Sequence, residues 1–437
     1  MPPLNDIAAI RARLEKAGGR EYWRSLEELA GTDEFQEFVR HEFPAGADLW
    51  PEATSRRDFL KLMGASLAVA FFAGCRRPLE AIVPYDVAPE DAVPGKPLSF
   101  ASALPFSGYA RGVLVTTNQG RPTKIEGNPS HPDSLGATDF FMQAATLAFY
   151  DPDRSQAVTF GGDISTWAAF QDALSSVAAL QDGKKGAGLR VLAESTTSPS
   201  LAAQFERLLR RFPAARRHQY EPAGRDNARA GARLAFGEPA ETRYRVGLAD
   251  VIVSLDADFL VGMPGGLSYA RDFAERRAPG RMNRFYMAET NLSVTGANAD
   301  HRLPLAPSAI EDLARALAAE IVGAPASAPR RPWTPSEAAW LRAAAADLRR
   351  RSGASLVVAG DAQPPIVHAL AHGMNVALDT EGRTVVHTEP VEADPVDQLA
   401  SLRALTEDMR AGRVEALLIL GGNPVYSAPA DLDFAAA

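Results

Sequence analysis

Short apolar runs, separated by stretches of helical periodicity, constrain the fold of this chain more than any other feature. They span residues 189–193, 251–255, 284–287, 355–359 and 416–420. Buried strands of this length that alternate with helices are typical of right-handed βαβ units. We therefore predict an α/β fold with mostly parallel sheets and flanking helices from residue 151 to residue 437. A hairpin is expected before it, with strands at 111–117 and 123–126.

Polar turn residues follow several of these predicted strands. Asp256, Glu289 and Asp361 come within two residues of the end of a run, and Gly421-Gly422-Asn423-Pro424 follows the last run. Ligands of open α/β sheets bind beyond the carboxyl ends of the strands, so these residues are candidates for a binding crevice. Their simpler role would be to make the turns, and the sequence alone favours that interpretation.

The composition limits the chemistry available to the chain. A formal net charge of -8 gives no support for nucleic-acid binding, so no nucleic-acid partner is expected. Cys75 is the single cysteine, which excludes an intrachain disulfide. A thiolate-ligated iron–sulfur cluster needs about four cysteines, so this chain is expected to hold no such cluster.

Residues 55–75 have the layout of a twin-arginine export signal. Arg56 and Arg57 precede Phe-Leu-Lys and then an uncharged, mostly apolar run. That run is shorter than the roughly 20 residues needed to span a bilayer. It ends in Phe-Ala-Gly before Cys75, which resembles a lipobox, so Cys75 is a candidate for lipidation. A small buried thiol is the alternative for Cys75.

The segments around this signal differ in character. Residues 1–54 carry apolar residues at helical spacing and predict a helical leader, which would pack on another protein or form a small hairpin of its own. Residues 76–100 are rich in proline and predict an extended linker. Residues 337–351 predict a connecting helix with an exposed face, whose Arg349-Arg350-Arg351 cluster would be solvated.

Common catalytic motifs are missing from the sequence. There is no Walker-type phosphate loop, no Gly-x-Gly-x-x-Gly after a strand and no Gly-x-Ser-x-Gly elbow. His368 and His372 have the i, i+4 spacing of a metal-binding helix but lack the glutamate of a zincin. Histidines in the core or on the surface of a helix are the favoured interpretation.

Residues 112–136 resemble the amino-terminal segment of the molybdopterin oxidoreductases. They read Gly-Val-Leu-Val-Thr-Thr-Asn-Gln-Gly-Arg-Pro-Thr-Lys-Ile-Glu-Gly-Asn-Pro-Ser-His-Pro, followed by Gly136. The resemblance implies cluster-ligand positions at Leu104, Ser107, Arg111 and Asp139, none of which is cysteine. Residues 101–150 are therefore expected to form a degenerate iron–sulfur-type small domain.

Other segments extend the resemblance. Residues 249–253, 299–307 and 420–424 resemble segments that line the pterin-dinucleotide site of that family. The leader and signal, from Tyr22 to Ser66, resemble those of the iron–sulfur subunit of alternative complex III. Because that subunit continues into a cluster-bearing half, and this chain stops soon after a predicted strand and turn, we expect a truncated or split product.

The resemblance implies a cofactor-free, molybdopterin oxidoreductase-like scaffold in a quinol-oxidising respiratory complex. Its location would be the periplasmic side of the bacterial inner membrane. The implied partners are a multihaem c-type cytochrome, quinol-oxidising integral membrane subunits and a terminal oxidase. Iron–sulfur clusters and haem c would be carried by the other half and by these partners.

Two further hypotheses stay open. One is an exported molybdopterin-dependent oxidoreductase with a non-cysteine metal ligand, for which Asp256, Gly421, Gly422 and Asn423 would lie near the crevice. The other is an independent periplasmic lipoprotein that binds a small ligand there.

Overall fold

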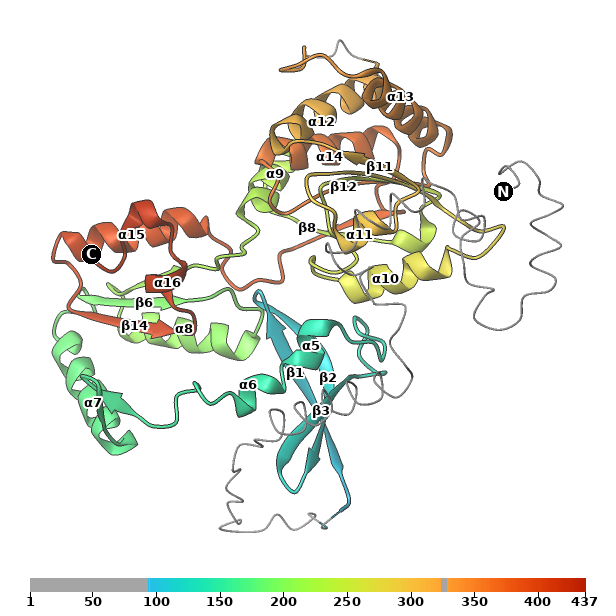
Figure 1. Cartoon of the computed structure of the whole chain (residues 1–437). Helices are drawn as coiled ribbons and strands as arrows, with labels where there is room; N and C mark the ends of the chain where they lie inside the picture. The colour runs from blue at the N-terminus through green and yellow to red at the C-terminus, as the bar shows by residue number, and fades with distance from the viewer. Residues whose placement is uncertain (1–92, 94, 324–327) are drawn as a thin grey trace, which may run out of the picture. The chain divides into compact units, whose positions relative to one another are not determined.

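A computed structural model describes residues 93, 95–323 and 328–437 (Figure 1). The described residues all belong to one unit, which runs from Ala88 to Ala437. The predicted leader, the export signal with Arg56, Arg57 and Cys75, and the predicted linker before residue 93 lie outside the described residues. In the part that the structure describes, no helix is long and apolar enough to cross a membrane.

The first described element is an antiparallel sheet of three strands, in the order β1-β2-β3. Its strands are β1 (Leu98–Phe106), β2 (Tyr109–Asn118) and β3 (Arg121–Gly127). The hairpin predicted at 111–117 and 123–126 is therefore confirmed. The predicted linker over 76–100 ends earlier than expected, because residues 98–100 already pair with β2. Most of β1 is exposed on both sides, so it has no hydrophobic alternation to reveal it.

Two short helices follow this sheet, and the first of them closes it into a small core. They are α5 (Phe140–Ala144) and α6 (Leu147–Tyr150). Asp139 is the N-cap of α5 and accepts a hydrogen bond from the backbone N–H of Met142 at 2.8 Å. Met142 is buried with Val113 and Ile125 from β2 and β3. A two-stranded hairpin, β4 (Thr159–Phe160) with β5 (Asp163–Ile164), follows.

A parallel sheet in the order β14-β6-β7 comes next, with helices on both faces. Its strands are β6 (Leu189–Ala193), β7 (Arg216–Gln219) and β14 (Ala416–Leu420). Its helices are α7 (Trp167–Asp182), α8 (Pro199–Arg211) and α15 (Gln398–Arg410). Val191 packs against Phe205 of α8, whereas the neighbouring Leu192 packs against Leu402 of α15. This alternation follows from the two-residue period of a strand.

A second parallel sheet, in the order β11-β10-β9-β12, contains the largest core of the described residues. Its strands are β9 (Val251–Leu255), β10 (Arg284–Glu289), β11 (His301–Pro304) and β12 (Ser355–Ala359). On one face lie α12 (Pro307–Val322), α13 (Pro335–Arg350) and α14 (Pro365–Ala377), and on the other lies α10 (Gly266–Glu275). Val253 faces the three helices, and Ile252 faces α10.

The remaining elements join these layers. The antiparallel pair is β8 (Glu241–Tyr244) with β13 (Val385–Thr388), and α9 (Asp226–Phe236) packs on α14. Gly231 permits this approach, since a Cβ there would lie 2.3 Å from the Cβ of His368. The short elements are η2 (Val246–Leu248), α11 (Val294–Ala297), α16 (Pro424–Ser427) and η3 (Ala430–Leu432).

The described residues confirm an α/β fold with mostly parallel sheets and flanking helices. All five apolar runs are strands of the two parallel sheets. The helix predicted at 337–351 exists as α13, but it is more than an exposed connector. Leu341, Ala344 and Leu348 lie buried in the core beneath the second sheet.

Asn375 allows us to test how α14 is bound to the sheet. The edge strand β12 directs the backbone N–H and C=O of Val357 toward α14, where the Asn375 amide pairs with both, at 2.9 and 2.8 Å. We expect Asn375→Leu to lower the free energy of unfolding by about 3 kcal/mol, because it leaves two buried backbone groups unpaired. Asn298→Ala, which removes an exposed amide, is the control. Urea denaturation that ranks the two variants equally would contradict this role.

Candidate functional site

A cavity of about 1080 Å³ lies at the carboxyl ends of β9 and β12. It is also bounded by the start of β2, the loop before α9 and strand β8. Asp256 and Asp361, two of the crevice candidates, line it. The cavity therefore occupies the place where α/β sheets bind ligands.

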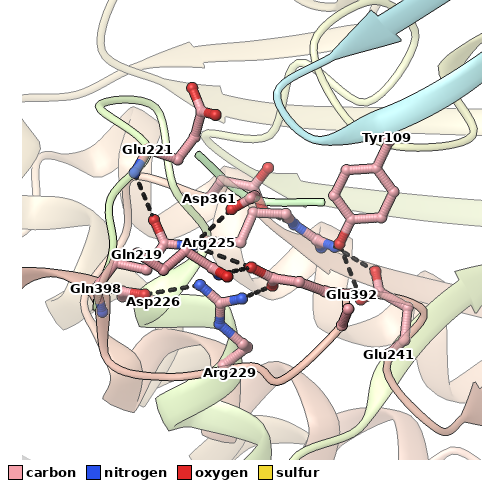
Figure 2. Close-up of polar contacts among 12 residues, drawn as sticks. Tyr109, Gln219, Glu221, Arg225, Asp226, Arg229, Glu241, Asp361, Glu392 and Gln398 are labelled. Atoms are coloured by element: carbon pink, nitrogen blue, oxygen red, sulfur yellow. Dashed lines mark hydrogen bonds and ion pairs between the residues drawn. The ribbon is translucent and has the colours of Figure 1, made fainter. Parts of the chain in front are cut away.

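Arg225 is the centre of the polar contacts on the cavity wall (Figure 2). Its Nε donates to Asp361 Oδ1 at 3.0 Å, and its Nη1 donates to Glu241 Oε1 and to the Tyr109 hydroxyl, the latter at 3.3 Å. The Tyr109 hydroxyl in turn donates to Glu241 Oε2 at 3.1 Å. One guanidinium thus ties β2, β8 and the end of β12 to the start of α9.

The burial of this cluster sets its charges. Burial lowers the pKa of the Arg225 guanidinium, but Asp361 and Glu241 outweigh it and hold that pKa well above its usual value. Burial raises the pKa of the Tyr109 hydroxyl. Arg225 is therefore a permanent cation and Tyr109 a neutral donor near pH 7. Neither residue has the features of a general base or a nucleophile poised to react.

A second buried network adjoins the first (Figure 2). Arg229 of α9 pairs with Glu392 and, at 2.7 Å, with Asp226. Glu392 also accepts from Gln219 at the end of β7 and from Gln398 of α15. This network ties the first parallel sheet to α9, and through α9 to the second. No local sequence signal marks either network, because partners such as Arg225 and Tyr109 lie 116 positions apart.

Asp256 and Glu289 stabilise the turns and elements beside them through hydrogen bonds. Asp256 has a left-handed backbone, with φ 58°, and its carboxylate accepts from the Thr290 N–H at 2.9 Å and from Gln363 Nε2 at 2.8 Å. It closes the turns that follow three neighbouring strands. Glu289 is the last residue of β10, is fully buried, and binds Arg302 and Ser293. Glu289 does not line the cavity.

The Gly421-Gly422-Asn423 candidates lie in the other parallel sheet. They follow β14, which pairs with β6, so the structure does not bring them to the cavity with Asp256. Gly421 and Gly422 have φ of +75° and +66°, and Asn423 is the N-cap of α16. The two glycines provide the left-handed backbone and Asn423 provides the helix cap, which agrees with a role in the turn. A Cβ on either glycine would lie 3.0 Å from the Glu194 carboxylate.

The four implied cluster-ligand positions lie in the small domain, three of them on the β1–β2 hairpin and the fourth at the N-cap of α5. Leu104 lies opposite Arg111 in the β1–β2 ladder, and Ser107 occupies the turn between these strands. Arg111 and Asp139 form an ion pair with both side chains less than a tenth exposed. The Arg111 guanidinium also lies 4.4 Å from the ring centroid of Phe106. Burial lowers the pKa of Arg111, and nearby Asp133 partly opposes that effect.

His368 and His372 are buried side chains of α14 and not surface ligands. Burial lowers their pKa to about 4 and about 3. His372 Nδ1 and His368 Nε2 have no hydrogen-bond partner. His372 packs against Phe236 and His387 instead, with ring centroids 4.9 and 5.3 Å away. Within the described residues, no group of three or more potential ligand side chains is arranged to hold a metal ion.

Comparisons with known proteins add limited information. No protein-family model and no curated protein match the chain. It is similar to acetylene hydratase from Pelobacter acetylenicus, with 13% identity and a TM-score of 0.40, over 65% of this chain and 42% of that one. It is also similar to a formyltransferase/hydrolase complex from Methylorubrum extorquens with methylofuran, with 20% identity and a TM-score of 0.34, over 51% and 57% of the two chains. The chain thus spans about half the length of these structures, and likeness at this level assigns no family or activity.

Arg225 offers a direct test of the first network. We expect Arg225→Ala to lower the free energy of unfolding by about 3–5 kcal/mol, because Asp361 and Glu241 would stay buried without their cation. Arg225→Lys keeps the charge but loses the planar fork, so its loss should be smaller. Arg207→Ala, an exposed arginine on α8, is the matched control. A loss no larger than that of the control, measured by chemical denaturation, would show that Arg225 does not hold these elements together.

The buried histidines predict acid sensitivity. Both have a folded-state pKa below the usual 6.5, so the unfolded chain binds more protons and stability falls as pH drops from about 6.5 toward 4. Each contributes a loss on the order of 3 kcal/mol. His372→Phe should flatten the curve of unfolding free energy against pH, because it removes one of the two depressed pKa values. Parallel curves for wild type and His372→Phe would refute this explanation.

Proposed function

We propose that the chain is the cofactor-free scaffold of the iron–sulfur subunit of a quinol-oxidising respiratory complex of the alternative complex III type. In this proposal it is exported by the twin-arginine pathway and works on the periplasmic side of the bacterial inner membrane. Its partners are a multihaem c-type cytochrome, quinol-oxidising integral membrane subunits and a terminal oxidase. Quinol electrons pass through cofactors of the cluster-bearing half and of these partners toward cytochrome c or the oxidase.

The Arg111–Asp139 ion pair is the observation that carries this proposal. These residues occupy two of the four positions that resemble the cluster ligands of molybdopterin oxidoreductases, and both are buried. A guanidinium and a carboxylate that neutralise each other have no affinity for iron, which these clusters bind through thiolates. Phe106 and Phe141, whose ring centroids are 4.4 Å apart, pack beside the pair. The small domain is thus stabilised by side chains in place of a cluster.

The cavity is a poor match for a pterin dinucleotide. Such a cofactor carries phosphate groups, but carboxylates outnumber guanidiniums on the cavity wall. Of the four cavity arginines, Arg111, Arg225 and Arg243 are already paired with carboxylates, and Arg245 donates to the Gly382 carbonyl. Asp256 and Asp258 are the carboxylates that would replace a cysteine as metal ligand, and they accept hydrogen bonds from Thr290 and Thr295. These residues do not fit the cofactor, and we derive no catalytic step through it.

A scaffold role gives the buried networks a purpose. Electron tunnelling falls steeply with distance, so cofactors held by different chains need a frame that keeps their spacing fixed. Arg225 and Arg229 join separate layers of the chain through buried charged hydrogen bonds, which are stronger and more directional than neutral ones. Such a frame would hold the cluster-bearing half and the haem-bearing partners over the membrane subunits.

Isolation of the native protein from membranes tests the proposal. Metal, pterin and haem contents should be measured together with the identity of the co-purifying chains. We expect iron and haem in associated chains, with molybdenum and pterin absent. Stoichiometric molybdenum and pterin on this chain would instead favour the exported oxidoreductase. A soluble monomer without redox partners would favour the ligand-binding lipoprotein.

The export step can be tested separately. We expect Arg56→Lys with Arg57→Lys to abolish delivery to the periplasm, because the twin-arginine receptor reads that pair. Arg11→Lys with Arg13→Lys makes the same chemical change upstream of the signal and is the control. Fractionation that finds both double variants in the periplasm would refute the assignment of the signal.

A further inference from the structure

A second cavity, of about 770 Å³, lies at the opposite edge of the β11-β10-β9-β12 sheet. It is bounded by the amino ends of β9 and β10 and by the carboxyl ends of α10 and α13. Five arginines line it, against three aspartates. These arginines are Arg276, Arg281, Arg284, Arg350 and Arg351.

The three aspartates are too few to neutralise the arginines of this cavity. Asp347 is shared by Arg284, Arg350 and the Tyr286 hydroxyl. Asp250 is shared by Arg276 and Arg351. Asp300 is bound through both its oxygens by Arg277, which is a further cation behind the wall. A net positive charge therefore remains around the cavity.

Arg281 is the arginine whose charge is left over. It lies on the exposed loop between α10 and β10, and among the described residues its guanidinium has no acidic partner. Its backbone is held in place, since its carbonyl accepts a hydrogen bond from Arg276 Nε at 2.8 Å. The loop thus presents a free guanidinium from a fixed position.

Asn283 adds an unsatisfied donor to the same wall. The residue is 1% exposed, and its amide nitrogen has no hydrogen-bond partner. Its amide oxygen accepts from Arg277 at 3.2 Å, which fixes the nitrogen as the free end. Buried donors are nearly always paired, so the Asn283 amide needs an acceptor that the described residues do not supply.

We propose that this cavity binds a phosphate group. Guanidiniums match the geometry of phosphate oxygens and bind them through paired hydrogen bonds. A phosphate group would accept hydrogen bonds from the unpaired Arg281 guanidinium, in a cavity where arginines outnumber aspartates. Free phosphate and the headgroup of an anionic phospholipid share this chemistry.

Calorimetric titration of the full-length chain with inorganic phosphate, at low ionic strength, tests the site. We expect saturable binding that Arg281→Ala weakens roughly tenfold, the usual effect of losing a charged hydrogen bond. Arg342→Ala removes an equal charge from the exposed face of α13, outside the cavity, and should leave the affinity unchanged. Arg281→Ala disturbs no ion pair, so the variant should fold as the wild type does.

A second arm distinguishes the two sources of phosphate. Phosphatidylcholine vesicles with and without phosphatidic acid are sedimented with the wild-type chain and with each variant. Binding that needs phosphatidic acid and Arg281, without affinity for inorganic phosphate, would assign the site to a lipid headgroup. If neither probe binds, or if Arg281→Ala and Arg342→Ala act alike, the proposal is wrong. Tighter, Arg281-dependent binding of a polyglutamate peptide would also overturn it, in favour of an acidic protein partner.

Discussion

The burial of one guanidinium constrains how the layers of this chain meet. The Arg225 side chain, at the start of α9, is only 15% exposed, and an unpaired cation in that position would cost several kcal/mol. The fold supplies Asp361 from the end of β12 and Glu241 from β8, and Tyr109 from β2 completes the contacts. Since the two carboxylates belong to different elements, a shift of either one would leave its charge without the Arg225 partner. The ion pairs therefore fix register and spacing as much as they add stability.

The parts of the fold that were predictable are those that a local pattern encodes. Runs such as Val251–Leu255 are apolar throughout because both faces of a parallel strand are covered by helices. Ser198, which caps α8 by accepting a hydrogen bond from the Leu201 N–H, and the turn after β14 also carry local signals. By contrast, β1 was missed because its side chains are largely exposed on both sides. Its position is set by pairing with β2, which a single-sequence pattern does not display.

The candidate site was predictable only where it coincides with strand ends. Asp256 and Asp361 were found because the carboxyl ends of parallel strands meet at one edge. Position after a strand does not tell which strands share a sheet. For that reason Gly421 was grouped with these aspartates, although it follows a strand of the other parallel sheet. Arg225 and Arg229 were missed because their partners are distant in sequence and an arginine before a helix is ordinary. The Arg111–Asp139 pair was visible as two non-cysteine positions, but their contact was visible only in the structure.

The two cavities of the second sheet differ in charge for a reason that lies in parallel α/β architecture. Helices that connect parallel strands point their amino ends toward the carboxyl edge of the sheet and their carboxyl ends toward the other edge. Their dipoles favour carboxylates at the first edge and cations at the second, by roughly 0.3–1 kcal/mol for each exposed charge. Asp256 and Asp361 lie at the first edge, and Arg276 and Arg351 cap the last turns of α10 and α13 at the second. Helix dipoles thus account for the excess of arginines at this edge. They do not explain why Arg281, on the loop beyond α10, has no acidic partner. The unpaired charge of Arg281 is therefore the observation that indicates a ligand at this edge.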